Sequence, residues 1–174
     1  MAPMPMEPMP EDLYALYAEF GIAAEKAQVL ETEAGNVALS FLTLLVNTDN
    51  ISAEETEMYW SIVDDINRKT FGTLLKHIKT ITNFDDSILK WMDEALEGRN
   101  YLTHHFFRTH NFALFNAEGR KAMVVELKEI QDKLVRAHAA LCGISSLMIE
   151  IAGRSGVAQD VALRLKTQGK KVRI

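Results

Sequence analysis

Residues 123–148 read MVVELKEIQDKLVRAHAALCGISSLM, and the spacing of their apolar side chains decides the fold class. The apolar positions recur every three or four residues, the repeat that places side chains on one face of an α-helix. This stripe consists of Met123, Val124, Leu127, Ile130, Leu134, Ala137, Leu141, Ile144, Met148 and Ile151. We therefore predict one long helix over about residues 118–152, capped at its start by Asn116.

The same repeat runs through most of the remaining chain. It predicts a first helix from Glu11 to about Val46. A second helix should follow the S-x-x-E capping box of Ser52 and Glu55. A shorter helix should open at Thr70, and a fourth, capped by Asp85 or Asp86, should span about 87–109. Because no segment alternates with a period of two, we predict no strand. The expected class is all-α: a four- to five-helix, mostly antiparallel up-and-down bundle.

Length and composition predict one ordinary globular domain. The chain has 174 residues, of which 48% are hydrophobic, and its net charge of −5 argues against a protein that coats DNA non-specifically. Proline recurs every two or three positions in residues 1–10, so we expect a disordered Met/Pro-rich arm there. The bundle should occupy residues 11–155, followed by a short helix and a basic tail over 156–174.

Several familiar sites and signals are missing from the sequence. Cys142 is the only cysteine, which excludes an internal disulfide and a cysteine metal cluster. There is no E-x-x-H pair, zinc spacing, Gly-rich phosphate loop or G-x-S-x-G elbow, so we expect no metal and no cofactor. The start lacks the features of a signal peptide, and no stretch reaches about 18 uninterrupted apolar residues. We therefore expect a cytoplasmic protein that does not span a membrane.

The stretch RNYLTHHFFRTH, residues 99–110, is the candidate site. On a helical wheel with roughly 100° per residue, Arg99 falls in the middle of the apolar stripe. Asn100 and His104 lie at about 100° and 140° from it, on one border between the faces. An arginine is almost never fully buried unless it is paired, and it cannot lose its charge. Arg99 should therefore have a carboxylate partner or point to a site that receives anions.

These residue types suit metal-free cleavage of RNA. The arginine can hold a phosphate, the histidine can transfer a proton near neutral pH, and the asparagine can orient either one. A structural interpretation is also open. In it, Arg99 pairs with an acid such as Glu31 or Glu33 on the first helix, and His104 is a satisfied core histidine. His105 is expected on the solvent face.

The run RNYLTH, residues 99–104, followed by HFF, resembles the R-x4-6-H motif of the HEPN superfamily. Asn100 fits the polar residue that commonly follows the arginine, and the motif lies in a late helix, as in that family. The resemblance implies a helical bundle that dimerises, with the motifs of two subunits forming one composite site. It also implies that Arg99 stabilises the phosphate, Asn100 orients it and His104 transfers the proton.

Members of this superfamily are often metal-independent endoribonucleases that act as toxins or defence effectors, and others are inactive binding or regulatory modules. The resemblance therefore implies a homodimer that cleaves single-stranded RNA through its 2′-hydroxyl, with a non-catalytic HEPN-like dimeric module as the alternative. It further implies a toxin–antitoxin setting, with an antitoxin protein such as a small nucleotidyltransferase as a partner. No family role is assigned to His105.

Overall fold

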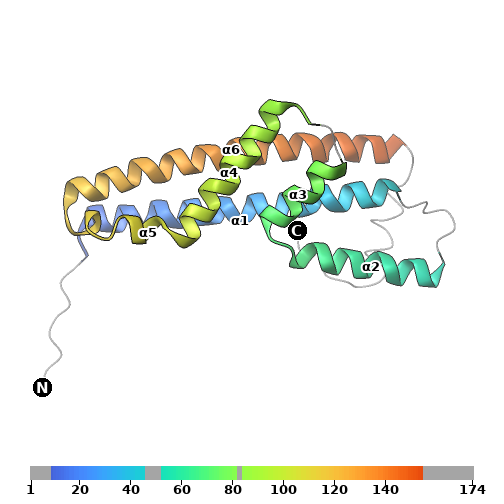
Figure 1. The fold of residues 1–174 in the computed structure, drawn as a ribbon, viewed down its shortest axis with the longest axis horizontal. Coiled ribbons are helices and arrows are strands. Elements are labelled where there is room, and N and C mark those ends of the chain that lie inside the picture. Colours follow the sequence, from blue (N-terminus) through green and yellow to red (C-terminus); the bar gives the residue numbers. More distant parts are fainter. Residues whose placement is uncertain (1–8, 46–51, 82–83, 155–174) are drawn as a thin grey trace, which may run out of the picture.

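The structure, a computed structural model, describes residues 9–45, 52–81 and 84–154 (Figure 1). All regular elements in these ranges are helical, which confirms the all-α prediction. They are α1 (Glu11–Leu45), α2 (Ala53–Arg68), α3 (Phe71–Ile81), α4 (Asp86–His104), α5 (Phe106–Thr109), the 3-10 turn η2 (Ala113–Phe115) and α6 (Ala117–Arg154). Most of the predicted arm and all of residues 156–174 lie outside the described residues.

The two longest helices, α1 and α6, pack side by side along their lengths and form the spine of the molecule (Figure 1). In each helix the buried side chains recur every three or four residues, as the sequence predicted. The fully buried ones include Leu16, Leu30, Val37, Met123, Leu127, Leu134 and Leu141. Burial of each leucine contributes roughly 1.5–3 kcal/mol, so this seam is a main source of stability. Ile151, which was predicted to belong to the stripe, is instead 46% exposed.

Polar contacts along the seam show that α1 and α6 run in the same direction. Near the start of both helices, Asp12 Oδ2 lies 2.6 Å from Arg120 Nη2. Further along both, Ser145 Oγ donates to Glu33 Oε1 at 2.5 Å. The residue numbers therefore rise together along the pair. The bundle class is confirmed, but its longest pair is parallel rather than antiparallel, because α2 to α5 return the chain before α6 begins (Figure 1).

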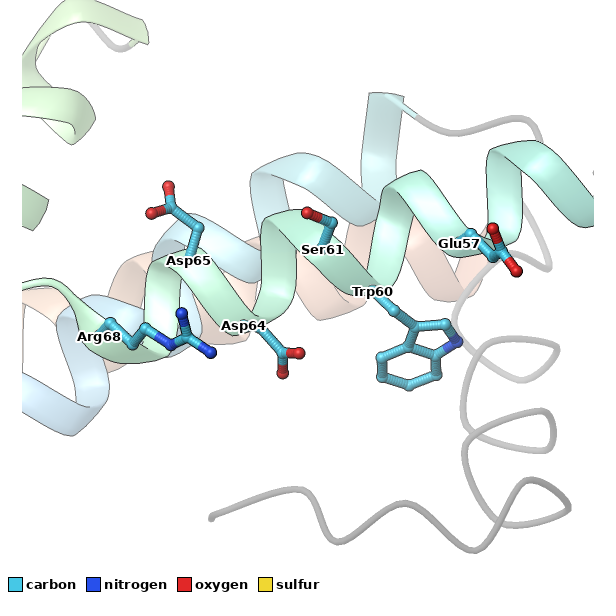
Figure 2. A pocket seen from close by; sticks show the side chains of 6 residues that line it. All are labelled: Glu57, Trp60, Ser61, Asp64, Asp65 and Arg68. Atoms are coloured by element: carbon cyan, nitrogen blue, oxygen red, sulfur yellow. The ribbon is translucent and has the colours of Figure 1, made fainter.

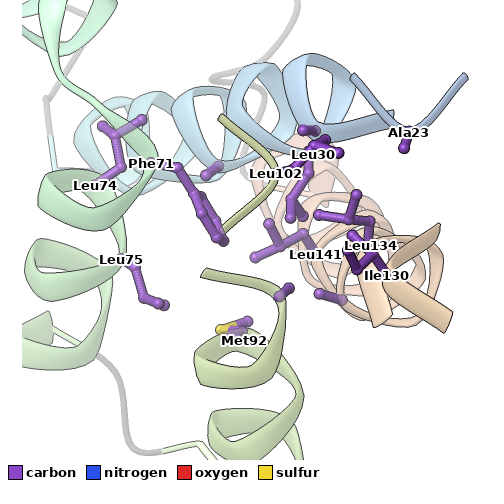
Figure 3. Packing of buried hydrophobic residues seen from close by; sticks show 14 of the residues in the cluster. Ala23, Leu30, Phe71, Leu74, Leu75, Met92, Leu102, Ile130, Leu134 and Leu141 are labelled. Carbon is purple, nitrogen blue, oxygen red and sulfur yellow. The ribbon is translucent and has the colours of Figure 1, made fainter. Parts of the chain in front are cut away.

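Helices α3 and α4 close the core beside this spine. A contact of Glu94 with Arg136 at 4.0 Å and the approach of Gly98 to Ile130 show that α4 runs opposite to α6, because the residue numbers change in opposite senses. Phe71, at the start of α3, is 1% exposed and reaches into the space between α1 and α4 (Figure 3). Helix α4 thus packs on the spine with one face buried, and its other face is exposed.

The helix starts follow the predicted capping chemistry. Asp85 Oδ1 accepts a hydrogen bond from Ser87 N at 2.8 Å and caps α4. Asn116 Oδ1 accepts one from Gly119 N at 2.7 Å and caps α6. Both predicted caps are confirmed. The side chain of Glu55, half of the capping box predicted before α2, lies outside the described residues.

Helix α6 is also apolar enough to meet the simplest criteria for a membrane span. Between Ala117 and Ile151 it contains an 18-residue window with a mean hydropathy of 1.4. A helix that packs in a protein core meets the same length and composition criteria, so this finding is weak support for a span. The absence of a spanning segment stays a prediction.

Candidate active site on α4

Helix α4 carries the three predicted site residues outside the middle of its buried face. That face packs against the spine through Met92, Ala95, Gly98 and Leu102, which are spaced three or four residues apart. Arg99 is half-buried beside it, while Asn100 and His104 are exposed. The wheel placed Arg99 in the middle of the apolar stripe and Asn100 and His104 on its border. In the structure Arg99 is off-centre, with 22% of its side chain exposed, and Asn100 and His104 lie roughly 145° and 185° from the middle of the buried face.

Arg99 is paired with Glu31 of α1. Its Nη2 lies 3.3 Å from Glu31 Oε2, and its Nη1 donates to Asn100 Oδ1 at 3.2 Å. The other oxygen of the same carboxylate, Oε1, accepts from Phe71 N at 2.7 Å, at the first residue of α3. Of the two acids proposed from the sequence, the structure selects Glu31, because Glu33 faces α6 and bonds to Ser145. Glu31 therefore fixes both the guanidinium and the start of α3.

His104 ends α4 with its imidazole in solvent. Within the described residues the ring makes no hydrogen bond or ion pair, and its one recorded contact is an edge-on approach to the ring of His105, with the centroids 6.2 Å apart. His104 is therefore not a satisfied core histidine. Its ring nitrogens are free to meet a substrate or a second protein surface.

The helix predicted over 87–109 is interrupted at His105. This residue has φ −128° and ψ −27°, outside the helical range, so α4 ends at His104 and the four-residue α5 follows. Phe106 is nevertheless fully buried and packs against Phe20 of α1. Phe106 therefore stays in the core despite the break, while His104 and His105 remain in solvent.

A second polar cluster lies just beyond the break, and sequence reasoning missed it. His110 Nε2 lies 2.5 Å from Glu126 Oε2 of α6 and 3.3 Å from Tyr101 Oη. Burial raises the pKa of Tyr101 above its ordinary value, and the Glu126 carboxylate adds to this shift. The sequence does not reveal this cluster, because the partner of His110 lies 16 residues away on another helix.

Two acids of α4, Asp93 and Glu94, form ion pairs away from His104. Asp93 Oδ1 lies 2.6 Å from Lys79 Nζ of α3, and Glu94 lies 3.9 Å from Lys90. In the part of the chain that the structure covers, the three-ligand group with metal-binding spacing occurs elsewhere, at Glu33, His138 and Cys142. The candidate site therefore combines a guanidinium paired with a carboxylate, an amide and an imidazole.

Two concave regions of the surface lie apart from these residues. Among the described residues, one is lined by six side chains of α2, namely Glu57, Trp60, Ser61, Asp64, Asp65 and Arg68 (Figure 2). The other is a groove between α1 and α6 that includes Lys26 and His138. Among the described residues that line these two regions, none is Arg99, Asn100 or His104.

Comparison with protein-family models, with curated proteins and with solved structures gave no match for this chain. The function is therefore inferred from the residues of the site and their geometry.

Proposed function

We propose that the chain is a cytoplasmic, metal-independent endoribonuclease of the HEPN type, which cleaves single-stranded RNA as a toxin or defence effector. The observation that carries this proposal is the last turn of α4. There the imidazole of His104 makes no hydrogen bond with any described residue, and it lies five residues after a guanidinium that Glu31 holds in place. A five-residue step spans about 7.5 Å of helix, a distance that an arginine side chain can largely cover.

In this proposal Arg99 binds the scissile phosphate. A guanidinium carries five N–H groups, and the two contacts to Asn100 and Glu31 use only part of them. The remaining donors are available for phosphate oxygens and would stabilise the charge that develops on phosphorus. Asn100, which is exposed and bonded to the guanidinium, orients it without adding charge.

His104 supplies proton transfer. Its neutral imidazole takes the proton of the 2′-hydroxyl, the 2′-oxygen forms a bond to phosphorus, and the bond to the 5′-oxygen breaks. The leaving oxygen takes a proton from solvent or from His104 of a second subunit. The products are a 2′,3′-cyclic phosphate and a 5′-hydroxyl. No metal ligand is needed for these steps, since the RNA provides the nucleophile.

The second candidate function is a non-catalytic dimeric module of the same type. It is favoured by the ion pair between Arg99 and Glu31, because this carboxylate neutralises the charge that would attract a phosphate. The net charge of −5 acts in the same direction. Such a module would bind a partner protein, for example an antitoxin.

Incubation of the untagged full chain with single-stranded RNA, followed by mass analysis of the product ends, tests the proposal. We expect cleavage in EDTA, cyclic phosphate ends, and no cleavage of DNA or 2′-O-methyl RNA. His104→Ala should lower the rate by about 10²-fold or more, whereas the matched control His105→Ala should not. A requirement for Mg²⁺ or products with a 3′-hydroxyl would exclude this mechanism. If no RNA is cleaved, the non-catalytic module is the better description.

A further inference from the structure

Three side chains with metal-binding atoms meet on the seam between α1 and α6. His138 and Cys142 are four residues apart on α6, so they lie on the same face of the helix. Glu33 of α1 faces them, and one ligand atom from each of the three lies within 4.8 Å of the other two. All three side chains are half-buried. The sequence alone does not predict this group, because Glu33 is more than 100 positions away from His138 and Cys142.

The spacing fits a tetrahedral metal. Zn–S and Zn–N bonds of about 2.3 Å and 2.0–2.1 Å, set at the tetrahedral angle, place sulfur and nitrogen roughly 3.5–3.6 Å apart. Cys142 Sγ lies 3.5 Å from His138 Nε2 and 3.8 Å from Nδ1. The distance from the sulfur to Nε2 is thus that of two ligands of one ion, and a turn of the imidazole ring would aim its lone pair at that ion, because the sulfur now lies nearly as close to Nδ1.

The Glu33 carboxylate accepts hydrogen bonds from neighbouring side chains, as metal-binding carboxylates commonly do. Ser145, which is 9% exposed, donates to Glu33 Oε1 at 2.5 Å. Asn36 Nδ2 donates to Glu33 Oε2 at 3.0 Å. These two bonds fix the plane of the carboxylate, and each oxygen retains a lone pair for a cation. Packing of α1 on α6 does not require a thiol and an imidazole beside this acid.

We propose that Glu33, His138 and Cys142 bind a Zn²⁺ ion that links α1 to α6. A thiolate, an imidazole and a carboxylate are the ligand types that Zn²⁺ takes, whereas Mg²⁺ and Ca²⁺ prefer oxygen ligands alone. Three protein ligands leave a fourth position for water or an added ligand. Each ligand comes from a helix of the spine, so the ion clamps the parallel pair near its carboxyl-terminal half.

This site is separate from the proposed ribonuclease site. Glu31 and Glu33 are two residues apart on α1 and therefore point to different sides of it, roughly 200° apart. Glu31 faces Arg99 and α3, and Glu33 faces α6. Removal of the ion should therefore not change the rate of the metal-independent RNA cleavage. A negative result for one of the two proposals would leave the other standing.

Titration of the reduced, chelator-treated, untagged full chain with Co²⁺ tests the proposal by absorption spectroscopy. We expect one ion per chain, d–d bands of tetrahedral intensity, and a thiolate-to-Co²⁺ charge-transfer band. Because Cys142 is the only cysteine, that band identifies its ligand even without a variant. Added Zn²⁺ should abolish both sets of bands. Absence of the charge-transfer band at saturating Co²⁺ would overturn the proposal.

Variants then assign the other ligands. His138→Gln and Glu33→Gln should each weaken Co²⁺ binding, and Ser145→Ala should weaken it by about tenfold or more through the loss of the bond that orients Glu33. The matched control is His77→Gln, an exposed histidine of α3, which should bind Co²⁺ like the wild type. Far-ultraviolet circular dichroism confirms that each variant is folded. Equal affinity for the wild type and folded His138→Gln would also refute the assignment.

Discussion

At the scale of single residues, Gly119 is the position where the fold tolerates no side chain. A Cβ atom there would lie 2.2 Å from the carbonyl oxygen of Ala113 and 2.7 Å from its Cα, both of which are backbone atoms of η2. Because backbone cannot move aside as a flexible side chain does, we expect Gly119→Ala to lower the free energy of unfolding by about 2 kcal/mol or more. Urea denaturation followed by circular dichroism measures this change.

Gly21 provides the matched control for this substitution. It lies on α1 with nothing within 4 Å of its added Cβ, so Gly21→Ala should raise the free energy of unfolding by about 0.5–1 kcal/mol through helix propensity. The two substitutions should therefore have opposite signs. If Gly119→Ala were as stable as the wild type, the close contact between η2 and α6 would not exist in solution.

For Arg99, the sequence predicted the kind of partner but not which residue it is. The wheel predicted an arginine within an apolar stripe, and the cost of burying its charge predicted an acidic partner. Sequence alone could not choose between Glu31 and Glu33. The choice depends on which side of α1 faces α4, and that is set by the packing of all the helices together.

At the scale of elements, the start of α3 is stabilised by a residue 40 positions earlier in the chain. Glu31 Oε1 accepts from Phe71 N, and Glu31 Oε2 pairs with Arg99. Loss of Glu31 therefore removes a helix cap and an ion pair together. We expect Glu31→Ala to cost about 1–2 kcal/mol of unfolding free energy, and Arg99→Ala about 1 kcal/mol or less, because that pair is partly exposed.

A double-mutant cycle of Glu31→Ala and Arg99→Ala, measured by chemical denaturation, gives the coupling between the two residues. It should be about 0.2–1 kcal/mol, the range for partly exposed pairs. A loss of several kcal/mol in Arg99→Ala would show that the arginine is chiefly structural. That result would favour the non-catalytic module over the ribonuclease.

The ends of α4 separate what periodicity can and cannot predict. Its start was predictable, because an aspartate that caps a helix is a local signal. Its end was not, because Leu102 and Phe106 are four residues apart and both buried, so the apolar repeat continues across the break at His105. A change in one backbone dihedral angle leaves no trace in a pattern of apolar residues.

At the scale of the whole molecule, the relative direction of two packed helices depends on which helices become neighbours in the fold, and these need not be consecutive in the sequence. Short loops predict antiparallel neighbours for consecutive helices. The longest pair, α1 and α6, is not consecutive, and its parallel direction emerges only from contacts such as that of Asp12 with Arg120. The apolar stripes predicted which faces of these helices are buried, but they carry no information on direction.

The contact of Asp12 with Arg120 should also make stability depend on pH. The hydrogen bond from Arg120 lowers the pKa of the Asp12 carboxyl below its ordinary value of 3.8. A carboxyl group whose pKa is lower in the folded chain stabilises the fold above the unfolded pKa, and this contribution is lost as the pH falls through the folded pKa. Asp12→Asn should therefore lower the Tm at neutral pH but not in acid below the folded pKa.

Thermal unfolding of the wild type and Asp12→Asn across a pH series checks this expectation. The difference in Tm between the two should shrink steadily once the pH falls below about 4. Asp132→Asn, an exposed aspartate of α6, is the control and should show no such trend. A difference that is constant with pH would mean that Asp12 acts through packing rather than through its charge.

The last prediction concerns the assembly that the proposed function requires. In the proposed mechanism His104 alone transfers protons in each chain, which gives an incomplete acid–base pair, so a two-fold homodimer that brings two copies of α4 together would complete the site. Phe112 and Phe115, in and beside η2, are 80% and 81% exposed and follow α5 directly in the chain. Such large exposed aromatic side chains are typical of interface cores rather than of free surfaces. We therefore expect a dimer at micromolar concentration and physiological salt in sedimentation equilibrium.

Phe115→Asp should give monomers, whereas Met58→Asp, at a 65% exposed site on α2, should not. A wild-type chain that sediments as a monomer would leave His104 without a second imidazole and would contradict the composite site.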